Sequence, residues 1–175
     1  MSARLPEIIE PLSLCDRGEQ LQGYIPLAGM GRLAGLLRHL DGGVEVDLQF
    51  DVDLQGVRLL RGHMKTEVAL ECQRCMETVV KPVELDVLLG FVDSEAAGKQ
   101  LPGEYEPSVL EAPTVALREL VEDELILALP IVALHPLDEC SGNARYEAAD
   151  DQSPVIEEKV NPFAVLEGLK KDKPD

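Results

Sequence analysis

The sequence predicts an α+β domain in which an amphipathic helix packs on an antiparallel β-sheet. Residues 44–54 alternate apolar and polar side chains without a miss, two more alternating stretches follow, and residues 115–129 carry apolar side chains at helical spacing. The chain has 175 residues, 45% of them hydrophobic, which suffices for one domain with its own core. We expect this domain over residues 1–140 and a mobile, acidic tail over residues 141–175.

The first forty residues give the weakest signals of regular structure. Residues 4–14 mix apolar side chains with Pro6 and Pro11, which favours an edge strand because proline cannot donate a hydrogen bond to a sheet ladder. Apolar residues recur at helical spacing over residues 29–40, and Asp-Gly-Gly follows them. We expect a short amphipathic helix there.

Three strands are expected in the middle of the chain. Residues 44–54 have one apolar and one acidic face, and Gln55-Gly56 supplies a turn into a second strand over residues 57–72. Gly62 in the second strand indicates a bulge. The third strand covers residues 79–92, so the Cys72 to Cys75 stretch becomes the connection of a hairpin.

A loop and the main helix follow the third strand, in which Pro82 indicates an edge or a bulge. Residues 93–113 are rich in proline and glycine and predict a loop with at most a short strand near residues 105–110. Thr114 is the expected N-cap of the helix, and Pro130 stops it. Its apolar stripe consists of Leu117, Leu120, Val121, Leu125 and Ala128.

An acidic cluster lies on the same predicted helix. Grouped carboxylates can hold Mg²⁺ in a nuclease-like site. The spacing of Glu119, Glu122 and Asp123 also describes a solvated helix face opposite the apolar stripe, and we favour that interpretation. The cluster consists of Glu119, Glu122, Asp123 and Glu124.

The cysteines offer a candidate zinc site. Cys72 and Cys75 form a C-x-x-C motif at the predicted hairpin turn, and His135 and Cys140 can complete a Cys₃His set that ties the end of the domain to the hairpin. A thioredoxin-like redox pair is the second interpretation, but that motif requires a helix after the first cysteine, whereas a strand is expected here. A pair of ordinary reduced thiols is the third. Cys15 is interpreted as a small buried hydrophobic residue.

A basic strip is expected along the second strand. Arg61, His63 and Lys65 alternate on one strand face, and Arg74 lies in the turn beyond them, an arrangement suited to nucleic-acid phosphates. Pairing with acidic residues across the sheet is the competing interpretation. The acidic residues available for it are Glu45, Asp47, Asp51 and Asp53.

The overall charge limits the classes of partner. The formal net charge is −17, which disfavours general affinity for polyanions. Aromatic residues make up only 3%, so base stacking as a means of RNA recognition is disfavoured. No apolar stretch is long enough to span a bilayer, and the N-terminus lacks a signal-type pattern, so we expect a cytoplasmic protein with no membrane partner.

The tail ends in a short predicted helix. Asn161 is suited to the N-cap and Pro162 to the first helical position, and Phe163 and Leu166 supply apolar contacts. A helix shorter than about 12–15 residues is marginal in water, so this piece must dock on its own domain or on a partner.

Three motifs together resemble the YceD family of large ribosomal RNA subunit accumulation proteins. They are Glu-Cys-Gln-Arg-Cys at 71–75, Val-Glu-Asp-Glu-Leu-Ile-Leu-Ala-Leu-Pro at 121–130 with His135 and Cys140 beyond it, and Asn-Pro-Phe-Ala-Val-Leu at 161–166. The resemblance implies a bacterial ribosome biogenesis factor acting on large-subunit rRNA, with metal and nucleic-acid binding as expectations. Some relatives carry a second cysteine pair where this chain has His135 and Cys140. The resemblance implies no catalytic residues.

We therefore expect a non-catalytic factor that supports synthesis, processing or stability of large-subunit rRNA. Its expected partners are a pre-ribosomal particle, a ribosomal protein or an rRNA-processing enzyme, or the rRNA itself, and the acidity favours a basic protein. A metal-dependent ribonuclease that trims rRNA precursors is the alternative, and a redox module is the third class.

Overall fold

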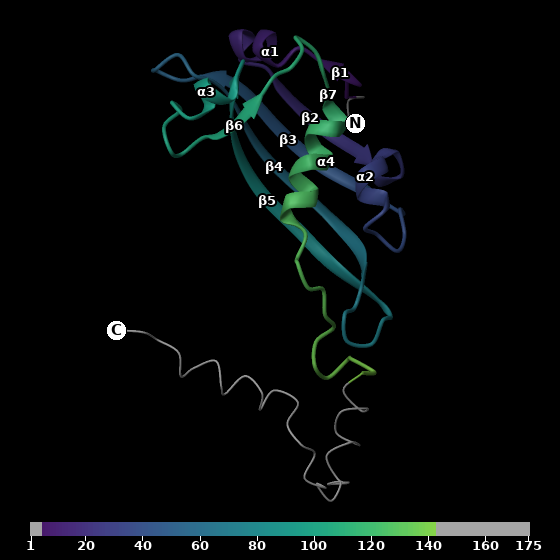
Figure 1. The fold of residues 1–175 in the computed structure, drawn as a ribbon. Coiled ribbons are helices and arrows are strands. Elements are labelled where there is room, and N and C mark those ends of the chain that lie inside the picture. The colour runs from purple at the N-terminus through teal and green to yellow at the C-terminus, as the bar shows by residue number, and fades with distance from the viewer. Residues whose placement is uncertain (1–4, 143–175) are drawn as a thin grey trace, which may run out of the picture.

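A five-stranded sheet organises the computed structural model, which describes residues 5–142 (Figure 1). Neighbouring strands β2 to β5 are antiparallel, whereas β6 runs parallel to β5. This confirms the predicted α+β class, with β6 making the sheet mixed. The strands, in spatial order, are β2 (Gln20–Pro26), β3 (Gly43–Val52), β4 (Arg58–Glu71), β5 (Thr78–Val92) and β6 (Glu106–Val109).

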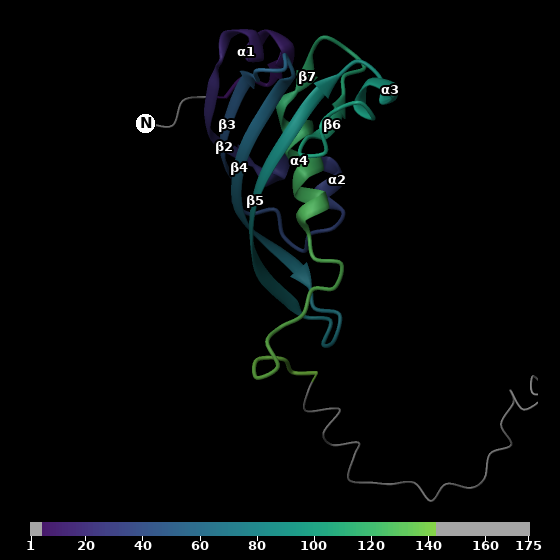
Figure 2. The same ribbon diagram turned by 90° about the vertical axis from the view of Figure 1, so that its left-hand side faces the viewer.

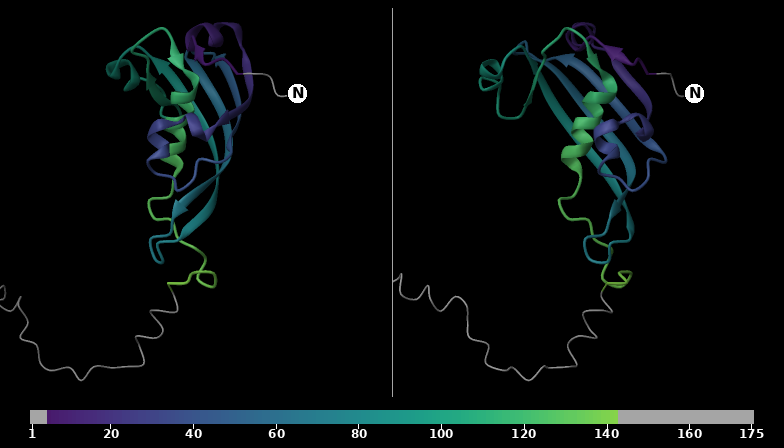
Figure 3. Two further views of the ribbon diagram at one scale, coloured as in Figure 1. Left: turned by 90° about the vertical axis from the view of Figure 1, so that its right-hand side faces the viewer. Right: turned by 45° about the vertical axis from the view of Figure 1, so that its right-hand side comes forward.

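Helix α4 (Leu117–Ala128) covers one face of this sheet, as the side views show (Figures 2 and 3). The strands predicted at 44–54, 57–72 and 79–92 are confirmed within two residues. Their alternating apolar residues point to the helix side, and full burial of each such side chain stabilises the fold by roughly 1.5–3 kcal/mol. The buried set includes Phe50 from β3, Leu60, Met64, Val68 and Leu70 from β4, Cys72 directly after β4, and Leu117, Val121 and Leu125 from α4.

The two ends of the sheet differ in width. At the closed end, β6 pairs with β5 residues 89–92, α1 (Pro11–Arg17) packs on β3 and β4, and α3 (Glu95–Gly98) lies beside β6. At the other end, β3 stops pairing with β4 at Lys65. Beyond that point β4 and β5 continue as a ladder, here called the distal hairpin (residues 67–82), and only an isolated bridge from His39 to Ala69 joins it among the described residues.

The edge strand predicted over residues 4–14 is wrong for most of its length. Among the described residues 5–14, only Ile8–Ile9 (β1) forms a strand, which pairs with β7 (Val115–Ala116), and α1 follows. Pro11 occupies the start of this helix, where its missing N–H has no helical partner to lose, and Gly18 ends it with a left-handed φ of 63°.

The helix predicted over residues 29–40 is much shorter in the structure. A 3₁₀ turn, η1 (Leu27–Gly29), precedes α2 (Gly31–Ala34), and no helix continues past Gly35. The following backbone pairs with β4 instead: the Arg38 N–H donates to the Ala69 carbonyl at 2.7 Å. Tertiary pairing therefore overrides the helical spacing of the apolar residues.

The expected bulge at Gly62 is absent from the described ladder, because the register of β4 with both neighbours is continuous. Gly62 instead makes room for neighbouring side chains. A Cβ there would lie 2.6 Å from a Val87 methyl carbon and 3.0 Å from one of Leu48. Pro82 lies where β5 has β4 on one side and no described strand on the other, which fits its predicted edge position.

The main helix begins later than predicted. Thr114 is not its N-cap, because Val115–Ala116 forms β7 and the helix starts at Leu117. It ends before Pro130 as predicted, but Ala128, expected in the apolar stripe, is exposed. No helix among residues 5–142 has the length and apolar character needed to cross a membrane. The tail prediction from residue 143 on, including Asn161, Pro162, Phe163 and Leu166, lies outside the described residues.

Candidate metal centre

The first half of the centre is built by the turn between β4 and β5. The Cys72 N–H donates to the Glu77 carbonyl, and the Met76 N–H donates to the Cys72 carbonyl, both at 2.8 Å. Met76 adopts a left-handed φ of 64°, which lets the chain reverse within six residues. Both cysteines of the motif are thereby held in one tight turn.

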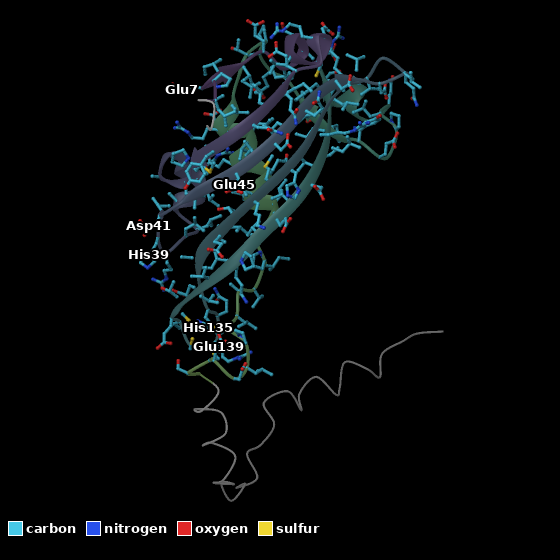
Figure 4. All side chains as sticks on the ribbon, turned by 180° about the vertical axis from the view of Figure 1, so that it is seen from behind. Glu7, His39, Asp41, Glu45, His135 and Glu139 are labelled. Carbon is cyan, nitrogen blue, oxygen red and sulfur yellow. The ribbon has the colours of Figure 1, made fainter. Side chains whose placement is uncertain are left out.

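The second half comes from the segment after α4, which runs back along the distal hairpin. The Gln73 N–H donates to the Ala133 carbonyl at 2.9 Å, and the His135 N–H donates to Cys72 Sγ at 3.4 Å. These contacts bring residues 135–140 to the turn. In Figure 4, His135 and Glu139 lie at this end of the molecule, far from Glu7 at the other.

The structure thus brings together the four residues predicted as ligands. One ligand atom from each of Cys72, Cys75, His135 and Cys140 lies within 4.8 Å of every other. The Cys72 and Cys140 sulfurs are 4.0 Å apart, and Cys75 Sγ is 3.3 Å from His135 Nδ1. Around tetrahedral zinc with Zn–S near 2.3 Å, two sulfurs are about 3.8 Å apart, so the donor set fits this ion.

The orientation of His135 supports ligation through Nδ1. Its other ring nitrogen, Nε2, lies 3.1 Å from the Thr78 carbonyl oxygen, so Nε2 carries the proton and donates it there. Histidine ligands of metals characteristically donate their second N–H to a carbonyl or carboxylate, which fixes ring and tautomer. Sequence reasoning missed Thr78, because its contribution is a backbone carbonyl that no residue type reveals.

The electrostatics of the turn favour a thiolate at Cys72. Burial opposes the charged form, but N–H groups of His135, Cys75 and Arg74 outweigh this and lower the pKa of Cys72 to about 5. The pKa of His135 is raised, chiefly by its interaction with Cys72. A thiolate is the form that binds metal. Cys15, by contrast, is buried near Leu59, and burial raises its thiol pKa to about 11.

The acidic cluster of α4 has a structural use that the sequence did not reveal. Glu122 is only 4% exposed and accepts hydrogen bonds from the Arg32 and Leu33 N–H groups at 2.7 and 2.8 Å. Asp123 forms an ion pair with the Arg32 side chain. The expectation of a solvated face is therefore wrong for Glu122. Its position three and four residues before Leu125 and Ile126, at the border of the apolar stripe, was the available signal.

The residues of the predicted basic strip are separated by the structure. Arg61, His63 and Lys65 form an exposed row on the sheet face away from α4. Acidic residues flank this row: His63 Nδ1 is 2.8 Å from Asp86, and His63 Nε2 is 3.4 Å from Glu84, which also lies 4.0 Å from Lys65. Arg74 lies apart in the turn, where Nη1 of its guanidinium is buried.

Comparison with other proteins adds the family context. The sequence model of a family described as "Large ribosomal RNA subunit accumulation protein YceD" matches residues 60–170. A Haemophilus influenzae protein of the same name is 33% identical over 168 residues, which cover 95% of this chain and 97% of that protein. No solved structure matches the chain significantly. The family match includes both halves of the candidate metal centre.

Proposed function

The chain belongs to the family of large ribosomal RNA subunit accumulation protein YceD, and on this premise we propose that it supports synthesis, processing or stability of large-subunit rRNA in the bacterial cytoplasm. The proposed mode of action is binding, without catalysis. This choice rests on the contacts that the carboxylates of α4 and the Cys₃His set make within the fold.

The candidate ribonuclease carboxylates support binding over catalysis. Glu122 caps backbone N–H groups of α2 and Asp123 pairs with Arg32, so neither is available to a magnesium ion without breaking those contacts. The Cys₃His set offers four protein ligands, as structural zinc sites do, whereas a catalytic zinc keeps one position open.

The proposed partner is a basic protein of the pre-ribosomal particle, such as a ribosomal protein or a basic rRNA-processing enzyme. The net charge of −17 attracts such partners and repels bare RNA. The basic row on the open sheet face is flanked by Glu84, Asp86 and Asp47, which weakens its attraction for phosphates. Direct contact with large-subunit rRNA is the competing outcome, and an experiment must distinguish it from binding to a basic protein.

Crosslinking the protein in living cells, followed by sequencing of bound RNA and identification of bound polypeptides, tests this proposal. We expect polypeptides of the large-subunit precursor as the main products. Crosslinks to rRNA alone would show direct RNA binding instead. Cleavage of a precursor transcript by the purified protein, lost in Glu122→Gln, would establish the ribonuclease.

We also propose that Cys72, Cys75, His135 and Cys140 bind one Zn²⁺ ion. Bound zinc would hold the segment after α4 against the hairpin turn and supply no chemistry beyond this attachment. The test is the metal content of protein purified without chelators. We expect one zinc per chain, and none in Cys140→Ser; metal-free wild-type protein would refute the site.

Residues 161–169 are the proposed contact with the pre-ribosomal partner, through Phe163 and Leu166 after the Asn161-Pro162 start. Truncation before Asn161 is expected to reduce association with pre-ribosomal particles and the level of large-subunit rRNA. Unchanged association and rRNA levels would exclude this contact.

A further inference from the structure

A groove of about 500 Å³ lies at the open edge of β5, outside the metal centre. One wall is formed by residues 81–84 of β5, and the other by residues 128–134 after the end of α4. Here β5 pairs only with β4, because β6 meets it at residues 89–92. The groove therefore runs along a strand edge that no described strand covers.

Several apolar side chains that line this groove are left uncovered by the described residues. Val132 is 56% exposed, Pro82 and Pro130 are exposed, and Leu134 is half-buried. Exposed apolar residues grouped at a groove are typical of a binding surface.

We propose that residues 161–169 of the same chain dock in this groove in the free protein. The described chain ends at Gly142, beside the hairpin turn, where a Cβ on this glycine would be 3.0 Å from the Arg74 carbonyl. Residues 143–160 link Gly142 to the segment. Eighteen residues with random-coil dimensions span roughly 23 Å on average, so the groove at the same end of the molecule is within reach.

The tether decides between this occupant and a separate molecule. Phe163 and Leu166 are three residues apart, a spacing that would place both on one side of a helical turn and so suits a narrow apolar groove. Tethering to the same chain raises the effective concentration of a segment to the order of mM, so modest contacts suffice to dock it. A second copy or another protein must bind from solution without this advantage.

The absence of tryptophan from the whole chain permits a direct test with Phe163→Trp in the full-length protein. A docked indole is expected to emit at shorter wavelength than the same reporter in denaturant. Adding Val132→Asp on the groove is expected to abolish this shift. Leu54→Asp, at a fully exposed leucine in the β3–β4 turn, is the matched control and is expected to preserve it.

Ala128→Gln provides a second groove variant, because Val132 lies three residues from His135 and its replacement can disturb the metal centre. Ala128 is exposed and lines the groove, so the larger side chain is expected to abolish the shift with the circular dichroism spectrum unchanged. An emission maximum equal to that in denaturant overturns the proposal. So does a shift that fades on dilution, which indicates a second copy, or one that arises only with added large-subunit precursors, which indicates a partner.

The proposed docking in the groove and the proposed ribosomal function can be refuted independently of each other. The fluorescence measurement uses the isolated protein, whereas the function is tested by crosslinking in cells. If both hold, a partner that binds residues 161–169 must first displace them from the groove.

Discussion

The closed end of the sheet and the distal hairpin are stabilised by different kinds of contact. At the closed end, Phe50 and Phe91 stack with ring centroids 6.3 Å apart, and α1 and α3 add further contacts. At the distal hairpin, two strands extend beyond the rest of the sheet, and Cys72, His135 and Cys140 meet at their tip. A two-stranded hairpin by itself is marginal in water, so this end depends on the segments attached to it. Val68, Leu70 and Val79 are buried there. The two ends therefore share hydrophobic burial, and the distal hairpin differs by the group of candidate metal ligands at its tip.

The largest expected effect is at the closed end. Phe50→Ala removes a fully buried ring and is expected to lower the free energy of unfolding by about 3–5 kcal/mol, measured by urea denaturation. The folded fraction should keep the zinc proposed for the metal centre, because the ring is not among its candidate ligands. Loss of zinc from folded Phe50→Ala would show that the two ends are coupled. Val52→Ala, on the same strand but partly exposed, is the control with a small effect.

The next largest effect is expected from a comparison of two cysteine substitutions, one at each end of the sheet. Cys72→Ser is expected to eliminate bound zinc and to accelerate amide exchange in residues 67–82, with the closed end still protected. Cys15→Ser, at an equally buried thiol of the closed end, should retain zinc and the hairpin protection. Hydrogen exchange by mass spectrometry with metal analysis checks both. Equal exchange rates in the two variants would remove the distinction between the ends.

A smaller effect is expected where α2 meets α4, between the two ends. Glu122→Ala leaves two N–H groups of residues 32 and 33 without their acceptor and is expected to cost about 1.5–3 kcal/mol. Asp123→Ala removes only an exposed ion pair with Arg32 and should cost about 0–1 kcal/mol. Urea denaturation compares the two variants. Equal costs would mean that Glu122 is no more than a surface residue.

The smallest effect is expected on the open sheet face that connects the ends. The hydrogen bond to Asp86 raises the pKa of His63 above its ordinary 6.5. This pair therefore stabilises the fold fully below pH 6.5, and its contribution is lost as the pH rises through the pKa of the folded state. In Asp86→Asn, NMR titration should show a lower His63 pKa; an unchanged pKa would mean that Asp86 does not contact the ring in solution.

The sequence predicted the features that depend on local periodicity. Strict alternation over residues 44–54 and 57–72 specified two central strands, because a half-buried strand requires that pattern. The grouping of the four candidate ligands was also predictable, since Cys72 and Cys75 mark half of a possible site and few histidines and cysteines exist to complete it.

Features that depend on distant partners could not be predicted. The spacing over residues 29–40 was helical, but Arg38 pairs with Ala69 of β4. Glu122 resembled a solvated residue because the backbone N–H groups that donate to its carboxylate, those of residues 32 and 33, lie some ninety positions earlier. The parallel pairing of β6 likewise depends on how the loop after β5 folds back, which no periodicity encodes.

The order of the elements along the chain has a consequence for synthesis on the ribosome. Strand β5 is complete at Val92, but α4, which covers the apolar face of the sheet, ends only at Ala128, 36 residues later. At about 5–20 residues per second, that face leaves the ribosome roughly 2–7 s before its cover is made. During this interval the nascent chain presents Phe50, Leu60 and Met64 to the surroundings, so its yield in the cell should depend on chaperones that bind such surfaces.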